Sequence, residues 1–79
     1  MAYPNPSQGN VNVLLYSKVD TNATVSLYDV TGKEIYRAPV ELINGKNEIA
    51  FSVKVKPGML FLKVNSKQTN YGTSKILFR

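Results

Sequence analysis

Hydrophobic and polar residues alternate along most of this chain, a pattern that predicts β-strands. It is clearest in residues 56–65, where a proline–glycine turn precedes six residues that are apolar except for Lys63. A run this short, bounded by turn residues, is typical of a strand deep inside a sheet. With a period of two, Leu60, Leu62 and Val64 share one face, which we expect to point inward. The strand then needs a neighbour on each side and a cover over that face.

Other segments of the chain also have the character of short strands. Pro39 interrupts one of them, since proline removes a backbone donor, so we expect a return strand with Ile35 inward and then an edge piece. Asn44-Gly45 is a favoured dipeptide for a tight primed turn and predicts a hairpin. The expected strands are residues 10–16, 23–30, 33–37, 40–43, 47–55 and 73–78.

Two further stretches have the composition of turns. In residues 29–33 the Asp29 side chain is placed to cap the turn amides, and Gly32 supplies the positive φ of a bulged hairpin loop. Residues 3–9 carry two prolines and are expected to form an ordered opening turn. Met1 and Ala2 look like an expression start, which leaves residues 3–79 as the domain.

Together these signals predict an all-β fold. Six or seven short strands with regular turn signals are typical of a single small antiparallel β-sandwich of immunoglobulin-like type. An open barrel is the alternative. A chain of 79 residues forms one domain with one small core, and it contains no cysteine that could crosslink it.

Charge is distributed unevenly along the sequence. Residues 1–48 hold four cations and five acids, whereas residues 49–79 hold six cations and no acid. A one-signed segment indicates an acidic partner, a nucleic acid or an anionic membrane surface, or else lysines that protect sheet edges from aggregation. The cations are spaced along strands rather than clustered, which favours edge protection.

The residue types restrict the chemistry. Without histidine or cysteine, nucleophile triads and the usual transition-metal sites are missing, and no cofactor is expected. An acid pair such as Asp20 with Glu41 stays open, but we expect no enzyme. No apolar run is long enough for a membrane helix, so no membrane insertion is expected. Nucleic-acid binding has only a weak candidate set and is not expected: Phe61, Lys63, Tyr71, Lys75 and Phe78.

Five short motifs follow one another over almost the whole chain. They are Tyr3-Pro4-Asn5-Pro6 with Gly9, residues 27–33 (LYDVTGK), Gly45-Lys46-Asn47, Pro57-Gly58-Met59, and residues 75–79 (KILFR). In this order and spacing, the set resembles the C-terminal sorting domain of type IX secretion system cargo proteins of Bacteroidota. One departure is Leu60, where the family usually has an aromatic residue.

The resemblance implies a sorting signal. Such a domain follows a larger cargo protein, directs it through the outer-membrane translocon, and is then usually removed by a surface sortase upstream of the first motif. The implied partners are the translocon, shuttle and sortase proteins. The cargo would pass through the periplasm and outer membrane and become secreted or displayed at the cell surface.

The resemblance also nominates recognition residues. Lys63, Lys75 and Arg79 are the stronger candidates because a small core has no use for them. The remaining matched residues can equally be structural: Pro4, Asn5, Pro6, Gly9, Gly32, Lys33, Gly58, Ile76 and Phe78.

A second hypothesis is a fibronectin-like adhesive or carbohydrate-binding module. It would present aromatic side chains on one sheet face, and the possible members are Tyr16, Tyr28, Tyr36 and Phe61. The absence of tryptophan weighs against it.

Overall fold

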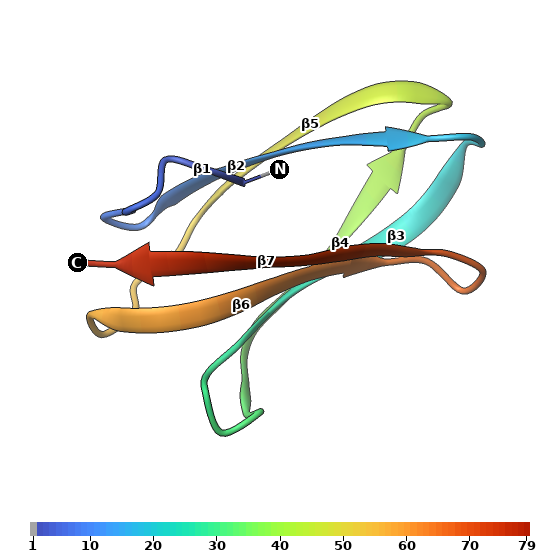
Figure 1. Ribbon diagram of the computed structural model, residues 1–79. Coiled ribbons are helices and arrows are strands. Elements are labelled where there is room, and N and C mark those ends of the chain that lie inside the picture. Colours follow the sequence, from blue (N-terminus) through green and yellow to red (C-terminus); the bar gives the residue numbers. More distant parts are fainter. Residues whose placement is uncertain (1) are drawn as a thin grey trace.

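Seven strands in two facing sheets make up residues 2–79, the part of the chain that the computed structural model describes (Figure 1). One sheet has the order β1-β2-β5 and the other the order β4-β3-β6-β7, and all pairings between these strands are antiparallel. The predicted β-sandwich is therefore confirmed. The strands are β1 Ala2–Tyr3, β2 Asn10–Ser17, β3 Thr21–Tyr28, β4 Glu34–Leu42, β5 Gly45–Ser52, β6 Gly58–Asn65 and β7 Asn70–Phe78.

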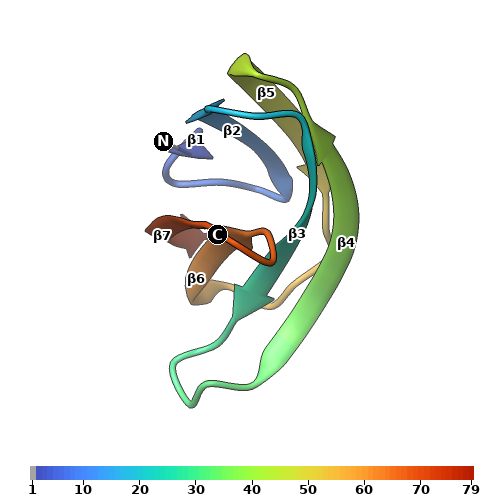
Figure 2. The same ribbon diagram turned by 90° about the vertical axis from the view of Figure 1, so that its right-hand side faces the viewer.

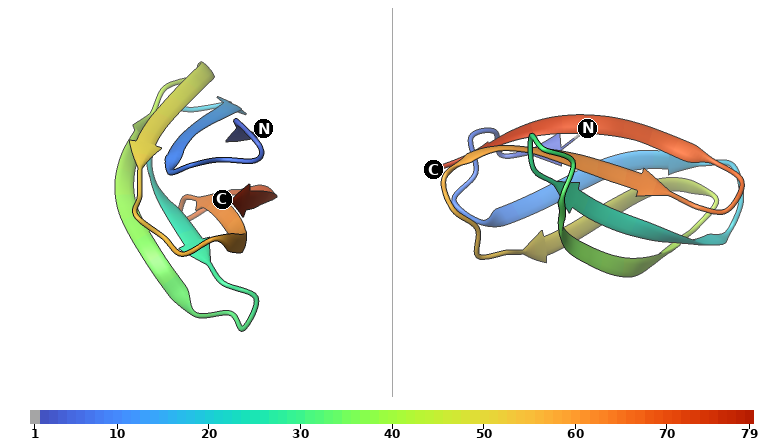
Figure 3. Two further views of the ribbon diagram at one scale, coloured as in Figure 1. Left: turned by 90° about the vertical axis from the view of Figure 1, so that its left-hand side faces the viewer. Right: turned by 90° about the horizontal axis from the view of Figure 1, so that it is seen from below.

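The two sheets cover each other as two layers. β4 and β5 curve along one side of the molecule, while β1 and β7 lie along the other (Figures 2 and 3). Among residues 2–79 there is no helix with the length and apolarity to cross a membrane.

β6 is the central strand that its sequence predicts. It pairs with β3 on one side and with β7 on the other. Leu60, Leu62 and Val64 are buried, whereas Lys63 is exposed on the opposite face. The inward faces of β2, β3 and β7 and Leu42 of β4 complete the core, and the strands contribute through the period-two pattern of their side chains.

The predicted edge position of residues 40–43 is confirmed, since β4 lies at the edge of its sheet, but the prediction for β4 is wrong in two other respects. The strand continues through Pro39, because β4 is the edge strand of its sheet and an edge tolerates a residue without an N–H group. Ile35 does not face inward and is 38% exposed. The reason is a register shift: Leu27 pairs with Tyr36 and Tyr28 pairs with Glu34, so Ile35 has no partner on β3. Tyr36 faces the core in its place and stacks on Phe51, with ring centroids 5.1 Å apart.

The predicted hairpin around Asn44-Gly45 is also wrong, since β4 and β5 belong to different sheets. The connection is held by the buried Asn47 side chain, whose Oδ1 accepts the Ile43 N–H at 2.8 Å and whose Nδ2 donates to the Ile43 carbonyl at 2.9 Å. The Asp20 carboxylate accepts the Asn44 N–H at 2.7 Å, so it closes the same turn. The Asn47 bonds are local and the Asp20 bond is long-range, and together they fix the turn that carries the chain from one layer to the other.

Several strand limits differ from those expected. β3 begins and ends two residues earlier than predicted, and β7 begins at Asn70 rather than at residue 73. β1 was not predicted, and its Ala2 pairs with Val13 of β2. The interpretation of residues 1–2 as an expression start stays a prediction, and Met1 lies outside the described residues.

Candidate recognition end of the sandwich

Four of the five sequence motifs meet at one end of the sandwich, which we call the motif end. β2 begins here and β5 ends here, with Asn10 opposite Ser52, and β6 begins where β7 ends, with Gly58 opposite Phe78. The β3–β4 loop, residues 29–33, projects below the sheets in Figure 1, and Asp29 and Val30 line a cavity together with the start of β6 at this end. The fifth motif, Gly45-Lys46-Asn47, lies at the opposite end, where Asn47 closes the β4–β5 connection.

The first and last motifs are joined by a ladder of hydrogen bonds, which we call the clasp. Asn5 Nδ2 donates to the Lys75 carbonyl at 3.1 Å, and the Leu77 N–H donates to Asn5 Oδ1 at 3.0 Å. Two residues further on, the Ser7 N–H donates to the Leu77 carbonyl at 2.7 Å and its own carbonyl accepts the Arg79 N–H at 2.9 Å. The Asn5 side chain thus repeats the bonding of a parallel strand residue, and the outer edge of β7 is covered from Lys75 onward.

Ser7 anchors this segment, although the sequence reading did not single it out. Its side chain is fully buried, its Oγ donates to the Asn10 carbonyl at 2.7 Å, and its Oγ accepts the Gly9 N–H at 3.1 Å. Gly9 in turn accepts the Val53 N–H at 2.9 Å. A serine followed at short range by glycine and asparagine is a turn signal that reasoning from sequence could have used.

Gly9 is the glycine that its surroundings constrain most. Its φ is +126°, and a Cβ built on it would lie 2.7 Å from the Val53 carbonyl oxygen, whereas Gly32 at φ +89° has no atom within 4 Å of such a Cβ. We expect Gly32→Ala to lower the free energy of unfolding by about 1–2 kcal/mol through strain alone. Gly9→Ala should lose a further 1–3 kcal/mol or so from the steric overlap. Urea titration of both variants measures this, and equal losses would contradict the packing of Gly9 against Val53.

The predicted hairpin loop at residues 29–33 is confirmed. Asp29 Oδ1 accepts the Thr31 N–H at 2.9 Å, the Thr31 hydroxyl at 2.6 Å and the Lys33 N–H at 3.0 Å. Gly32 has the positive φ that such a loop requires. Gly32 and Lys33 are exposed. The hydrogen bonds from the Thr31 hydroxyl and the Lys33 backbone outweigh desolvation and lower the pKa of Asp29 below its ordinary value.

This loop should make folding sensitive to acid. Because the folded-state pKa of Asp29 is lowered, its contribution to stability is present above the unfolded-state pKa of about 4 and is lost as the pH falls through the lower folded-state pKa. Asp29→Asn keeps an acceptor oxygen but cannot titrate. We expect the thermal midpoint of the variant to fall less than that of the parent between about pH 5 and pH 2. Parallel pH slopes would contradict this role.

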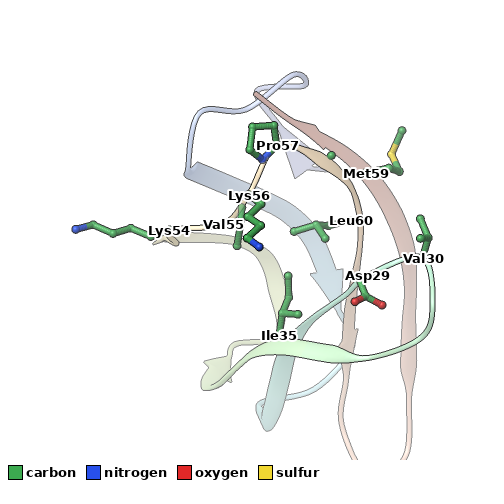
Figure 4. Close-up of a pocket in the computed structure, with 10 residues that line it drawn as sticks. Asp29, Val30, Ile35, Lys54, Val55, Lys56, Pro57, Met59 and Leu60 are labelled. Atoms are coloured by element: carbon green, nitrogen blue, oxygen red, sulfur yellow. The ribbon is translucent and has the colours of Figure 1, made fainter.

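An apolar cavity of about 470 Å³ opens beside the loop at the motif end. Figure 4 shows Ile35, Val55 and Leu60 directed toward its interior, with Lys54 extending away to one side. The register shift in the β3–β4 pair turns Ile35 toward this space. The residues lining it come from the β3–β4 loop, the start of β4, the β5–β6 connection and the start of β6: Asp29, Val30, Ile35, Lys54, Val55, Lys56, Pro57, Gly58, Met59 and Leu60.

The terminal motif divides into core and surface residues. Ile76 and Phe78 are buried, so their match to the motif has a structural explanation. Lys75 and Arg79 are exposed on the alternate positions. Lys63 lies on the outer face of the same sheet, with its Nζ 5.1 Å from the ring centroid of Tyr28. Among residues 2–79 the one ion pair is that of Arg37 with Glu34, so these three cations have no acidic partner.

The candidate residues for other binding functions share a face only in part. Tyr28, Phe61, Lys63 and Lys75 lie together on the outer face of β3, β6 and β7, but the other members lie elsewhere. In the set considered for nucleic acid, Phe78 is buried in the core. Tyr71 packs against the core, and its hydroxyl lies 3.0 Å from the Ser17 hydroxyl. These two aromatic residues are therefore separated from the exposed cations of the set. The aromatic residues considered for a carbohydrate site are divided as well. Tyr16 is exposed on β2, and Tyr36 packs inward between the sheets.

Pro4 and Pro6 are exposed on either side of Asn5, and Gly58 is half-buried at the start of β6. The structure brings the first and last motifs into direct contact and places the second and fourth motifs, residues 27–33 and Pro57-Gly58-Met59, beside one cavity. The model of the secretion system C-terminal sorting domain family matches residues 1–79. No curated protein and no solved structure matches the chain. Because the match spans the whole sequence, the chain belongs to the family of secretion system C-terminal sorting domains, the sorting signals of type IX secretion.

Proposed function

We propose that this domain directs a larger cargo protein through the type IX translocon and that the motif end is the surface which the machinery reads. The cargo precedes Tyr3 in the parent protein, and a sortase removes the domain upstream of the clasp. Shuttle, translocon and sortase proteins are then its partners, and the cargo reaches the cell surface or the medium. The family is one of sorting signals and not of enzymes.

The observation that carries this proposal is the clasp with its exposed cations. The hydrogen bonds of Asn5 and Ser7 hold the first motif against β7. Lys75 of β7 and Arg79, which directly follows β7, are exposed beside these bonds. Neither cation has an acidic partner among the described residues. Exposed charges contribute little to the stability of a small domain, but a receptor can read them by complementary charge.

A reporter fusion tests the sorting function. Residues 1–79 are fused to the C-terminus of a periplasm-targeted reporter and expressed in a cell with a type IX system and in the same cell without its translocon. We expect reporter outside the first cell and only in the periplasm of the second. The same reporter without the domain should stay in the periplasm of both. Export that does not depend on the domain or on the translocon would refute the proposal.

A further inference from the structure

The connection between β5 and β6 contains an extended segment whose backbone has no hydrogen-bond partner. Burial alternates along it, with Lys54 and Lys56 exposed and Val55 packed against the core, as in a strand. The backbone groups of these three residues make no hydrogen bond with any other described residue. The preceding residue, Val53, still donates its N–H to the Gly9 carbonyl at 2.9 Å.

The geometry of an extended chain gives these groups a direction. In an extended chain the N–H and C=O of one residue point to the same side, and those of the next residue point to the opposite side. Because Val53 faces Gly9, the backbone groups of Lys54 and Lys56 point away from Gly9. Residues 54–56 line a separate hollow with Gly9, whereas the lining of the apolar cavity does not include Gly9, so we place this cavity on the other side of the segment. They help to line it together with Ile35 and Leu60 (Figure 4). An unpaired strand edge, an apolar cavity and two lysines therefore lie side by side.

These three features together specify the ligand. Unpaired N–H and C=O groups in alternation are satisfied by another extended peptide, whereas a phosphate or sulfate offers acceptors alone. The cavity accepts apolar side chains on the face that Val55 occupies. On the other face, cross-strand neighbours of Lys54 and Lys56 are best placed if they are acidic. Asp29 is the one acid lining the cavity, and its Oδ1 is already bonded within its own loop.

We propose that the Lys54–Lys56 segment binds an extended acidic peptide of a partner protein by strand addition, with alternate apolar side chains of that peptide in the cavity. This goes beyond the sorting function, since it assigns a ligand to a segment that lies between the sequence motifs. A second copy of this chain is disfavoured as the occupant, because its formal net charge is +5 and residues 49–79 carry no acid.

Titration of the ¹⁵N-labelled 79-residue chain with a synthetic peptide tests the proposal. The probe is acetyl-Glu-Leu-Glu-Leu-Glu-amide, in which the glutamates and leucines fall on opposite faces of a strand. We expect saturable binding with a Kd on the order of 100 µM. Amide shifts should be confined to residues 53–59 and to the neighbourhood of Ile35. Hydrogen exchange at Lys54 and Lys56 should slow about tenfold at saturation, because their N–H groups gain acceptors.

Matched peptides and variants separate the contributions. An N-methylated version of the peptide should not bind, and Lys-Leu-Lys-Leu-Lys should bind at least about fivefold more weakly. The double variant Lys54→Gln, Lys56→Gln should also lose about fivefold in affinity. Its control is Lys18→Gln, Lys67→Gln, which removes the same charge from exposed positions at the opposite end and should bind as the parent does.

Specific outcomes would overturn the proposal. These are no binding at 1 mM peptide, roughly ten times the expected Kd, equal binding of the N-methylated peptide, or shifts confined to other sheet edges. Binding to anionic phosphatidylglycerol vesicles without binding to the peptide would assign the lysines to a lipid surface instead. Concentration-dependent dimerisation that involves residues 54–56 would assign the segment to self-association.

Discussion

Leu62→Ala is expected to lower the free energy of unfolding by about 2–5 kcal/mol, because it leaves a cavity in the one core of the domain. A chain of this size has a total stability of roughly 4–12 kcal/mol. Leu62 is 2% exposed and lies opposite Leu27 on the strand that pairs on both sides. The substitution therefore removes a large share of the total stability.

Leu77 provides the matched control for this change. It lies on β7, next to β6, but faces outward and is 37% exposed. Leu77→Ala should cost less than about 1 kcal/mol, since little apolar area leaves the core. Denaturant titrations of the two variants and the parent measure the difference. A loss of under about 1 kcal/mol for Leu62→Ala would mean that β6 is not central.

The strands that the sequence predicts well are those with one wholly apolar face. β2 and β6 each have an apolar face, and its residues are buried in the core or packed against it: Val11, Val13 and Leu15 from β2, and Leu60, Leu62 and Val64 from β6. The buried face of such a strand can be predicted from its own sequence, because with a period of two only one orientation of the strand buries all the apolar side chains. The loop at residues 29–33 is equally local, since Asp29 and Gly32 supply both its cap and its positive φ.

The features that were not predicted depend on residues far apart in the chain. Pro39 is compatible with β4 only because no strand pairs on its outer side, which is a property of the sheet and not of the segment. The turn at Asn44-Gly45 leads into the other sheet, and Asp20, 24 positions from Asn44, accepts the Asn44 N–H there. Short-range turn preferences carry no information about such a crossing.

The candidate site was predicted as separate motifs but not as an arrangement. Asn5 and Leu77 are 72 positions apart, and nothing local in either motif indicates that an amide side chain bonds the edge of β7. The lack of a strand paired with residues 54–56 was not predicted for a different reason. The pattern predicts a strand up to Val55, but β2 begins at Asn10, opposite Ser52, so the residues that follow Ser52 have no strand beside them.

Deleting residues 75–79 should abolish export of the fused reporter, and two causes would contribute to that loss. The deletion removes the buried Ile76 and Phe78, which are part of the core, and it also removes the exposed Lys75 and Arg79. A periplasmic reporter would therefore not reveal whether the signal is the fold or its charges. Two sets of substitutions separate them.

The double change Lys75→Gln, Arg79→Gln removes the charges alone. The clasp uses the Lys75 carbonyl and the Arg79 N–H rather than their side chains, so the hydrogen bonds of Asn5 and Ser7 persist. We expect this variant to unfold within about 1 kcal/mol of the parent, because exposed charges contribute little to stability. Its reporter should nevertheless remain in the periplasm if the cations are read by a receptor.

Asn5→Ala is the converse variant, because it keeps every cation and removes two hydrogen bonds of the clasp. The expected cost is about 1–3 kcal/mol, from roughly 0.5–1.5 kcal/mol for each bond. Export by this variant together with retention of the charge variant would show that the cations form the signal and that the clasp only supports the fold. The opposite result, with the charge variant exported and Asn5→Ala folded but retained, would contradict the role of Lys75 and Arg79. It would place recognition in the joined edge of β7 and the first motif.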